Sequence, residues 1–187
     1  MKTERLIYPK QLDELLSPMS VLEVWTDGGT TDNGRKDAFG GWSYVALPTD
    51  GKPIVGFSEH VPGLVTNNRC EMLGVMAAII GLAHPERKLI IKSDSQYVVK
   101  TVNEWRWGWP RKKDQSKIMN KELFEQLFFL VDNNHVDLQW VKGHSTSVGN
   151  NIADFWATRA MNKKPPTQAH IERADFVYYE GLEGFSI

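Results

Sequence analysis

The chain has 187 residues, of which 41% are hydrophobic and 24% are charged, and this is the size and composition of one globular domain. Its 22 basic and 23 acidic residues exclude a uniformly basic nucleic-acid coat protein and an acidic disordered chain, and its single cysteine excludes a disulfide framework or a four-thiolate zinc site. No apolar run approaches the roughly 18 residues of a membrane helix, and the first twenty residues contain no signal-peptide stretch, so we expect a cytoplasmic protein that does not contact a membrane.

The first half of the sequence predicts a short helix, three strands and a long helix. Residues 9–17 have a short amphipathic pattern, and VLEVWTDGG at 21–29 is a β-rich run that ends in an aspartate and two glycines. Two further strands are expected at 42–47 and 54–61, joined by a hairpin loop whose Asp-Gly pair is a turn signal. Apolar residues at three- and four-residue spacing then predict a helix over 68–83.

The second half alternates strands with helices. The predicted elements are a strand at 88–94, a helix at 95–105, a helix at 119–134, a strand at 136–141 and a helix at 149–162. The first of these strands again ends in an aspartate. Asn150 or Asn151 is the expected N-cap of the last helix, because asparagine is a favoured capping residue.

This order of elements predicts a mixed α/β domain. An antiparallel hairpin comes first, and the later strands need helical crossovers to join the same sheet. We divide the chain into an N-terminal extension (1–20), a domain (21–162) and a C-terminal tail (163–187) that is too short to bury a core of its own. Ligands of open α/β sheets bind beyond the carboxyl ends of strands, where Asp27 and Asp94 are expected.

Four acidic residues stand out by their positions. Asp27 and Asp94 end two predicted strands, Glu71 lies one turn into the first long helix, and Asp154 lies among apolar residues of the last helix. Buried acids are rare unless they are paired or bind a metal, and two Mg²⁺ ions held by oxygen ligands can catalyse hydrolysis of a phosphodiester. Alternatively, each acid is a cap, a turn residue or half of an ion pair.

Positive charge is concentrated in one stretch. Residues 100–121 contain seven basic and two acidic residues, and the tryptophans Trp105, Trp107 and Trp109 are interleaved with them. Basic residues mixed with aromatic ones favour nucleic-acid binding through phosphates and bases. The alternatives are a solvated helix face for the charges and protein core for Trp107 and Trp109.

Five motifs in order resemble the type 1 ribonuclease H family. They are TDGG at 26–29, TNNRCEM at 66–72, SDSQYV at 93–98, VKGHS at 141–145 and GNNIAD at 149–154. The resemblance spans roughly residues 21–162 and implies a mixed five-stranded sheet with helices on both faces. It also implies an endoribonuclease that hydrolyses the RNA strand of RNA–DNA hybrids with two Mg²⁺ ions, leaving 5′-phosphate and 3′-hydroxyl ends, with Mn²⁺ as an alternative ion.

The resemblance also implies roles for individual residues. The catalytic, metal-binding carboxylates fall on Asp27, Glu71, Asp94 and Asp154, and a mobile catalytic histidine falls on His144. Asp27 would bridge both ions, Glu71 and Asp94 would bind the ion nearer the leaving group, and Asp154 would bind the ion that activates water. Glu71 would also sense the ribose 2′-hydroxyl, which distinguishes RNA from DNA. His144 lies in a polar loop, where the alternative is a solvated histidine without a role in proton transfer.

Further residues match family positions that contact the substrate. They are Gly28, Gly29, Thr66, Asn67, Asn68, Gln96, Trp105, Arg106, Lys112, Lys113 and Asn150. The glycines allow close backbone approach, although a tight turn would also use them. The loop 30–40 departs from the family by its extra charge, Leu64 stands where many relatives have a basic phosphate contact, and Gly108 stands where some have asparagine. Cys70 is expected to be a small core residue.

Two other functions compete with this hypothesis. A noncatalytic module of the same fold would bind hybrids without cutting them, and loss of a carboxylate would mark it, whereas this chain has all four. An exonuclease of this fold is expected to carry Asp-x-Glu on the first strand, where this chain reads Asp27-Gly28-Gly29. We expect a monomer whose partner is an RNA–DNA hybrid, with the tail as a candidate docking segment for another protein.

Overall fold

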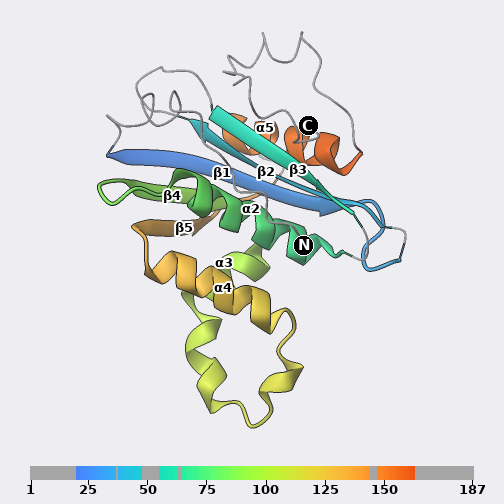
Figure 1. Cartoon of the computed structure of the whole chain (residues 1–187), viewed down its shortest axis with the longest axis vertical. Helices are drawn as coiled ribbons and strands as arrows, with labels where there is room; N and C mark the ends of the chain where they lie inside the picture. Colours follow the sequence, from blue (N-terminus) through green and yellow to red (C-terminus); the bar gives the residue numbers. More distant parts are fainter. Residues whose placement is uncertain (1–19, 37, 48–54, 63–64, 144–146, 163–187) are drawn as a thin grey trace.

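The computed structural model of the chain describes residues 20–36, 38–47, 55–62, 65–143 and 147–162. The predicted helix at 9–17, the predicted hairpin loop, His144 and the tail lie outside these residues. The described chain forms a five-stranded sheet in the order β3-β2-β1-β4-β5, with helices on both faces (Figure 1). This arrangement confirms the predicted fold class.

The sheet has an antiparallel half and a parallel half. Its strands are β1 (Val21–Thr30), β2 (Gly40–Leu47), β3 (Val55–Val61), β4 (Lys88–Ser93) and β5 (Val136–Trp140). β1 pairs antiparallel with β2, and β2 with β3, whereas β4 is parallel to both β1 and β5. Each parallel connection contains a helix, because a chain cannot return to the same end of a sheet through a short turn.

Helices cover the sheet from two sides. They are α2 (Asn67–Leu82), α3 (Gln96–Asn103), α4 (Lys121–Asp132) and α5 (Val148–Met161), with two 3₁₀ helices, η1 (Trp105–Arg111) and η2 (Gln115–Lys117). α5 packs across β1, β2 and β3 on one face, and α2 packs on the other face with α3 and α4 beside it (Figure 1). In the described part of the chain, no helix is long and apolar enough to cross a membrane.

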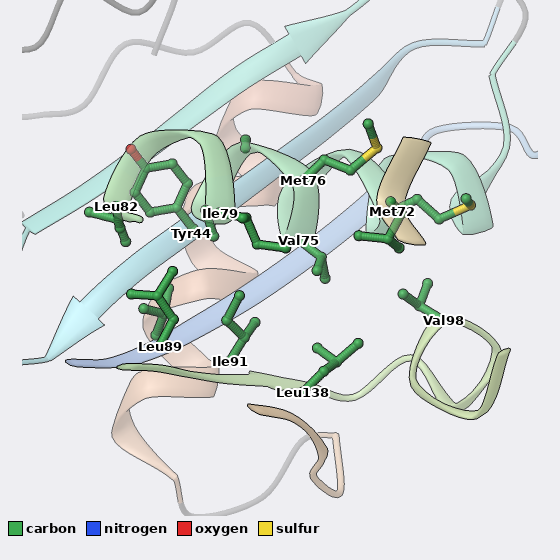
Figure 2. Packing of buried hydrophobic residues seen from close by; sticks show 14 of the residues in the cluster. Tyr44, Met72, Val75, Met76, Ile79, Leu82, Leu89, Ile91, Val98 and Leu138 are labelled. Atoms are coloured by element: carbon green, nitrogen blue, oxygen red, sulfur yellow. The ribbon is translucent and has the colours of Figure 1, made fainter. Parts of the chain in front are cut away.

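The main core lies between α2 and the sheet. Val75, Ile79 and Leu82 of α2 lie above Leu89 and Ile91 of β4, and each of these side chains is at most 1% exposed (Figure 2). Full burial of one such side chain contributes about 1.5–3 kcal/mol to stability. α2 is buried on most of its surface because the sheet covers one side of it and α4 packs against another. The core therefore fixes α2 firmly over β1 and β4.

Two predicted boundaries differ from the structure. β1 ends at Thr30, one residue beyond the strand predicted at 21–29, because its antiparallel pairing with β2 extends to Thr30. The helix predicted at 95–105 ends at Asn103, and the chain then continues as the 3₁₀ helix η1. The segment after Asn103 is therefore more tightly wound than its sequence pattern predicts.

The N-terminus of α5 also differs from the prediction. α5 begins at Val148, and Ser147 occupies the N-cap position. Asn150 lies inside the first turn and is only 2% exposed, so neither Asn150 nor Asn151 is the cap. The predicted capping role is wrong because the helix starts at Val148, one residue before the predicted start at 149, and Ser147 therefore takes the N-cap position.

Candidate active site

Asp27 and Asp94 are neighbours because β1 and β4 are parallel and in register. The last parallel pair joins Thr26 to Ser93, so Asp27 and Asp94 are the next residues on two adjacent strands. Asp27 also remains in the antiparallel ladder, where it pairs with Ser43 of β2, and this pairing holds its backbone in place. The two acids predicted at strand ends therefore meet at one edge of the parallel half of the sheet.

Glu71 reaches the same edge from α2. The helix begins after Thr66, whose hydroxyl accepts a hydrogen bond from the N–H of Arg69 at 3.4 Å. α2 can approach β1 closely because of Gly28, where a Cβ atom would overlap the backbone of Cys70 and Glu71. Gly28 thus has a packing role that brings Glu71 to the strand, and its contact with a substrate stays a prediction.

Three carboxylates converge at this point. Oxygen atoms of Asp27, Glu71 and Asp94 all lie within 4.8 Å of one another. Asp154 comes from α5, on the other face of the sheet, and is close enough to hydrogen-bond the carboxyl group of Asp27. Asp154 is exposed and lies outside the compact cluster. The four predicted acids are thus brought together as a cluster of three with the fourth beside it.

The pKa values of Asp27 and Glu71 are both raised in the metal-free protein. Burial, together with the charges of Asp94 and Asp154, raises the pKa of Asp27 from 3.8 to about 7. Glu71 is only 9% exposed, and burial followed by the charges of Asp27 and Asp94 raises its pKa well above 4.5. Desolvation and repulsion both disfavour the charged carboxylate. A bound cation would favour the charged carboxylates instead, because it attracts them and offsets both their mutual repulsion and the loss of water.

The available ligand atoms suit a hard divalent cation. Oε2 of Glu71 is buried and has no hydrogen-bond partner among the described residues, and such an oxygen is costly unless a ligand pairs with it. The clustered ligands are all carboxylate oxygens, which Mg²⁺ and Mn²⁺ prefer to softer ligands. Cys70, beside Glu71, is fully buried, and burial raises the pKa of its thiol to about 12. Cys70 is therefore a protonated core residue, as expected.

Gly143 is a site residue that the sequence analysis did not single out. A Cβ atom at Gly143 would lie 2.6 Å from Oδ2 of Asp94, so glycine leaves room for that carboxylate. The sequence does contain a signal for this role, because a glycine directly after a strand can mark a close approach of the backbone to another group. Gly143 follows β5 at the edge of the sheet that carries the acids. The next residue, His144, lies outside the described residues, and its catalytic role stays a prediction.

Predicted substrate contacts at the start of α2 are tied to the loop after β1. Asn67 accepts a hydrogen bond from the N–H of Thr30 at 3.0 Å, and its own N–H donates to Oδ1 of Asn33 at 3.0 Å. Asn33 was not predicted and has no distinctive sequence signal. Asn68 is half-buried, and Gln96 is the exposed first residue of α3. These contacts hold the loop and α2 together beside the acids.

Two other predicted contacts differ in their accessibility. Gly29 is half-buried, and the atom nearest to a Cβ placed there is Sδ of Met161 at 3.8 Å, an ordinary distance. Asn150 is buried, and its Oδ1 has no hydrogen-bond partner among the described residues. Contact between either residue and a substrate stays a prediction.

The part of the basic window between α3 and α4, which contains η1 and η2, forms a segment that projects from the body of the domain (Figure 1). Lys112 and Lys113 are exposed, and neither pairs with an acid in the described part of the chain. Trp105 and Trp107 are 48% and 64% exposed, whereas Trp109 packs against aromatic residues of α4. The core alternative therefore holds for Trp109 and is wrong for Trp107.

Arg106 differs from the other predicted substrate-binding cations. Its side chain is only 12% exposed, and its Nη2 lies 2.9 Å from Oδ1 of Asp132. Its guanidinium carbon lies 4.1 Å from the ring centroid of Trp107 and 5.2 Å from that of Phe128. The guanidinium of Arg106 is thus already paired with an acid of the protein itself.

The fold and the carboxylate cluster agree with comparisons to known proteins. The RNase H family model matches residues 19–162. The ribonuclease H of Granulibacter bethesdensis is 31% identical over 155 residues, covering 80% of this chain and 97% of that protein. The ribonuclease H of Syntrophotalea carbinolica is 33% identical over 146 residues, covering 76% of this chain and 91% of that protein. The chain therefore belongs to the ribonuclease H family of endonucleases.

Solved structures support the same conclusion. LC9-RNase H1, a type 1 RNase H with the type 2 active-site motif, has a TM-score of 0.67 and 25% identity, covering 89% of this chain and 80% of that chain. LC11-RNase H1 in complex with RNA/DNA hybrid has a TM-score of 0.56 and 18% identity, covering 76% of this chain and 97% of that chain, which shows the shared fold. The predictions of family, fold and enzyme class are confirmed.

Proposed function

We propose that the protein cleaves the RNA strand of RNA–DNA hybrids at internal positions, leaving 5′-phosphate and 3′-hydroxyl ends. The convergence of Asp27, Glu71 and Asp94 within 4.8 Å, in a chain of the ribonuclease H family, is the observation that carries this proposal. Asp154 beside Asp27 completes the acidic set. A noncatalytic binding module would have no need for four acids that repel one another.

The proposal includes two divalent metal ions, with Mg²⁺ as the favoured ion and Mn²⁺ as the alternative. Asp27, Glu71, Asp94 and Asp154 would hold these ions, and the unpartnered buried oxygen of Glu71 supports this assignment. When bound, the ions would stabilise charge at the attacking and leaving oxygens of the phosphodiester. Asp27 interacts with both Asp94 and Asp154, so it is the natural candidate to bridge the two ions.

The protein's own groups are proposed to bind and orient the RNA strand. Glu71 would accept a hydrogen bond from the ribose 2′-hydroxyl, which is absent from DNA. Gly29 would let the sugar-phosphate backbone approach Asp27, since no side chain stands in the way. His144 would carry a proton during the reaction or assist product release, because an imidazole changes charge near neutral pH.

Two groups of residues are proposed to recognise the hybrid on either side of the acids. Amide side chains at the starts of α2 and α3 would contact base edges and sugars, and Thr66 would bind a phosphate of the DNA strand. The projecting segment would contact DNA-strand phosphates through exposed lysines, with an aromatic ring packed along the strand. The proposed residues are Asn67, Asn68, Gln96, Trp105, Lys112 and Lys113. The hybrid-bound LC11-RNase H1, which shares the fold, supports this substrate.

We also propose that residues 21–162 form the catalytic domain, with residues 1–20 and 163–187 as appendages. The family match to residues 19–162 supports these limits. The monomeric state, the cytoplasmic location and a protein partner for the tail stay predictions from the sequence.

A charge-neutralising substitution at the cluster tests the proposed site. With a labelled hybrid and Mg²⁺, we expect Asp94→Asn to lose at least about 10²-fold in kcat, because one metal-binding carboxylate is gone. Asp137→Asn is the matched control: Asp137 is 40% exposed, pairs with Lys88 at 3.5 Å and lies at the opposite end of the parallel strands, so its loss should leave kcat unchanged. Wild-type activity in Asp94→Asn would refute the assigned site, and product ends other than those proposed would refute the reaction.

A further inference from the structure

We propose that Arg106 is a positioning residue that fixes the orientation of η1 on α4, and does not itself bind a phosphate of the hybrid. This inference rests on the proposed function, because orientation of η1 matters only if the projecting segment meets a substrate. It replaces the direct contact that the sequence predicts for Arg106.

The register of η1 places Arg106 and Trp109 on one face. A 3₁₀ helix has three residues per turn, so side chains three positions apart lie above one another. The Trp109 ring lies 5.7 Å from the ring of Phe124 and 5.2 Å from that of Phe128, both on α4. The same face of η1 carries the guanidinium of Arg106 to Phe128. Both residues therefore attach η1 to α4.

Arg106 makes the only polar attachment between η1 and α4 that we find among the described residues. Its Nη2 is 2.9 Å from Asp132, in the last turn of α4, and the guanidinium also lies over the rings of Trp107 and Phe128. A planar guanidinium can stack flat on aromatic rings while its several N–H donors form an ion pair, and a lysine ammonium lacks both the plane and the fork of donors. Trp107 is held at its other end, since its Nε1 donates to the carbonyl of Asn103 at 3.1 Å.

The exposed residues of η1 lie on other faces. Trp105 and Arg111 are six positions apart, so they share a face that does not carry Arg106, and both are exposed. A rotation of η1 on α4 would move Trp105 and Arg111 together, along with the two lysines that follow. Loss of the Arg106 attachment would therefore misdirect several substrate contacts without removing any of them.

A direct phosphate contact is the competing explanation, and it predicts the opposite response at Asp132. If Arg106 positions η1, removal of Asp132 weakens the attachment and reduces hybrid binding. If Arg106 binds phosphate, removal of Asp132 frees the guanidinium and strengthens binding. Asp132 is 53% exposed and is itself acidic, so it is not a phosphate ligand. The sign of the change at Asp132 therefore separates the two explanations.

The test measures KM, kcat and the salt dependence of hybrid binding for Arg106→Gln, Asp132→Ala and the double variant. We expect each single variant to raise KM about three- to tenfold with kcat within about twofold, the pattern of lost substrate binding. The KM of the double variant should be no higher than that of the weaker-binding single variant, because both substitutions break the same attachment. Lys113→Gln is the matched control: it should reduce the slope of log K against log salt by about 0.9, whereas Arg106→Gln should leave that slope unchanged.

A lower KM in Asp132→Ala, or a salt slope reduced by about 0.9 in Arg106→Gln, would overturn the inference while leaving the proposed function intact. Additive effects in the double variant would also overturn it. Arg106→Lys keeps the charge and loses the stacking, so we expect its KM to lie between those of the wild type and Arg106→Gln. Circular dichroism melts check that each variant is folded at the assay temperature. A wild-type chain that neither cuts nor binds the hybrid would refute the proposed function and this inference with it.

Discussion

Adjacent glycines on β1 illustrate how single residues determine the site. Gly28 faces the backbone of α2 at Cys70 and Glu71, with no room for a side chain, whereas Gly29 has ordinary space around it. The sequence predicts both glycines as substrate contacts and cannot separate them, because their difference depends on how closely α2 packs. The position of Glu71 relative to Asp27 therefore depends on the absence of a side chain at Gly28.

We therefore expect Gly28→Ala to destabilise the protein by about 1–3 kcal/mol, the usual cost of an overpacked core position, and to reduce kcat by displacing Glu71. Gly29→Ala is the control, and its free energy of unfolding should stay within about 0.5 kcal/mol of the wild type. Urea denaturation in EDTA measures both values. Equal stability of the two variants would show that the close packing of α2 on β1 does not require a glycine at position 28.

The pKa of Asp27 predicts how stability depends on pH in the metal-free protein. A folded-state pKa of about 7, compared with an ordinary 3.8, means that the folded protein binds more protons than the unfolded chain between these values. Stability should then fall as pH rises from about 4 to about 7, by up to about 1.4 kcal/mol per pH unit from this group. Glu71 shifts in the same direction and adds to the loss.

Denaturation of wild type and Asp27→Asn in EDTA, at pH 5 and pH 8, tests this effect. We expect Asp27→Asn to be the more stable protein at pH 8, because it has no charge to bury, and the difference should shrink or reverse at pH 5. Adding Mg²⁺ at pH 8 should stabilise the wild type more than the variant. Greater stability of the metal-free wild type at pH 8 would contradict the repulsion within the cluster.

Secondary-structure elements differ in how far their sequence predicts them. Local patterns predict that Asp27 and Asp94 each lie near the end of a strand, whereas their pairing depends on β1 and β4 being neighbours in the sheet. η1 could not be predicted, because its winding depends on Arg106 and Trp109 packing against α4, which lies ten or more residues further along the chain. The same packing explains why Arg106 is buried although it lies in a basic, exposed stretch.

The projecting segment as a whole predicts a salt-dependent interaction. Lys112 and Lys113 are exposed and unpaired with acids in the part of the chain that is described, so each should neutralise one phosphate. Replacing both with glutamine should raise KM, leave kcat nearly unchanged, and lower the slope of log K against log salt by about 2. Binding of a labelled hybrid in EDTA at several salt concentrations measures the slope. An unchanged slope would place the hybrid elsewhere on the surface.

At the scale of the whole molecule, sheet topology assembles the site from distant parts of the chain. β1 and β4 are brought together by a crossover that contains α2, and α5 adds Asp154 from the opposite face (Figure 1). The sequence predicts this arrangement only through the family resemblance, because strand order is not a local property. Every element that supplies a clustered acid lies within the family match at 19–162.

A shortened chain of residues 20–162 tests the proposed domain limits. We expect it to fold, because every described element is retained, and to cleave a hybrid with kcat within about twofold of the full chain. Thermal melts and the cleavage assay give the two readouts. Loss of folding would show that one of the removed segments belongs to the core, and loss of activity in a folded chain would assign a removed segment to the site.

The proposal with the widest consequences is that the carboxylate cluster holds divalent metal for cleavage of RNA paired with DNA. Its most direct test is one cleavage assay with labelled RNA as a hybrid, as an RNA duplex and as a single strand. Each form is incubated with Mg²⁺, with EDTA and with the Asp27→Asn variant. We predict cleavage of the hybrid alone, abolished by EDTA and by the variant. Equal cleavage of all three RNAs, or activity that survives in Asp27→Asn, would contradict the claim.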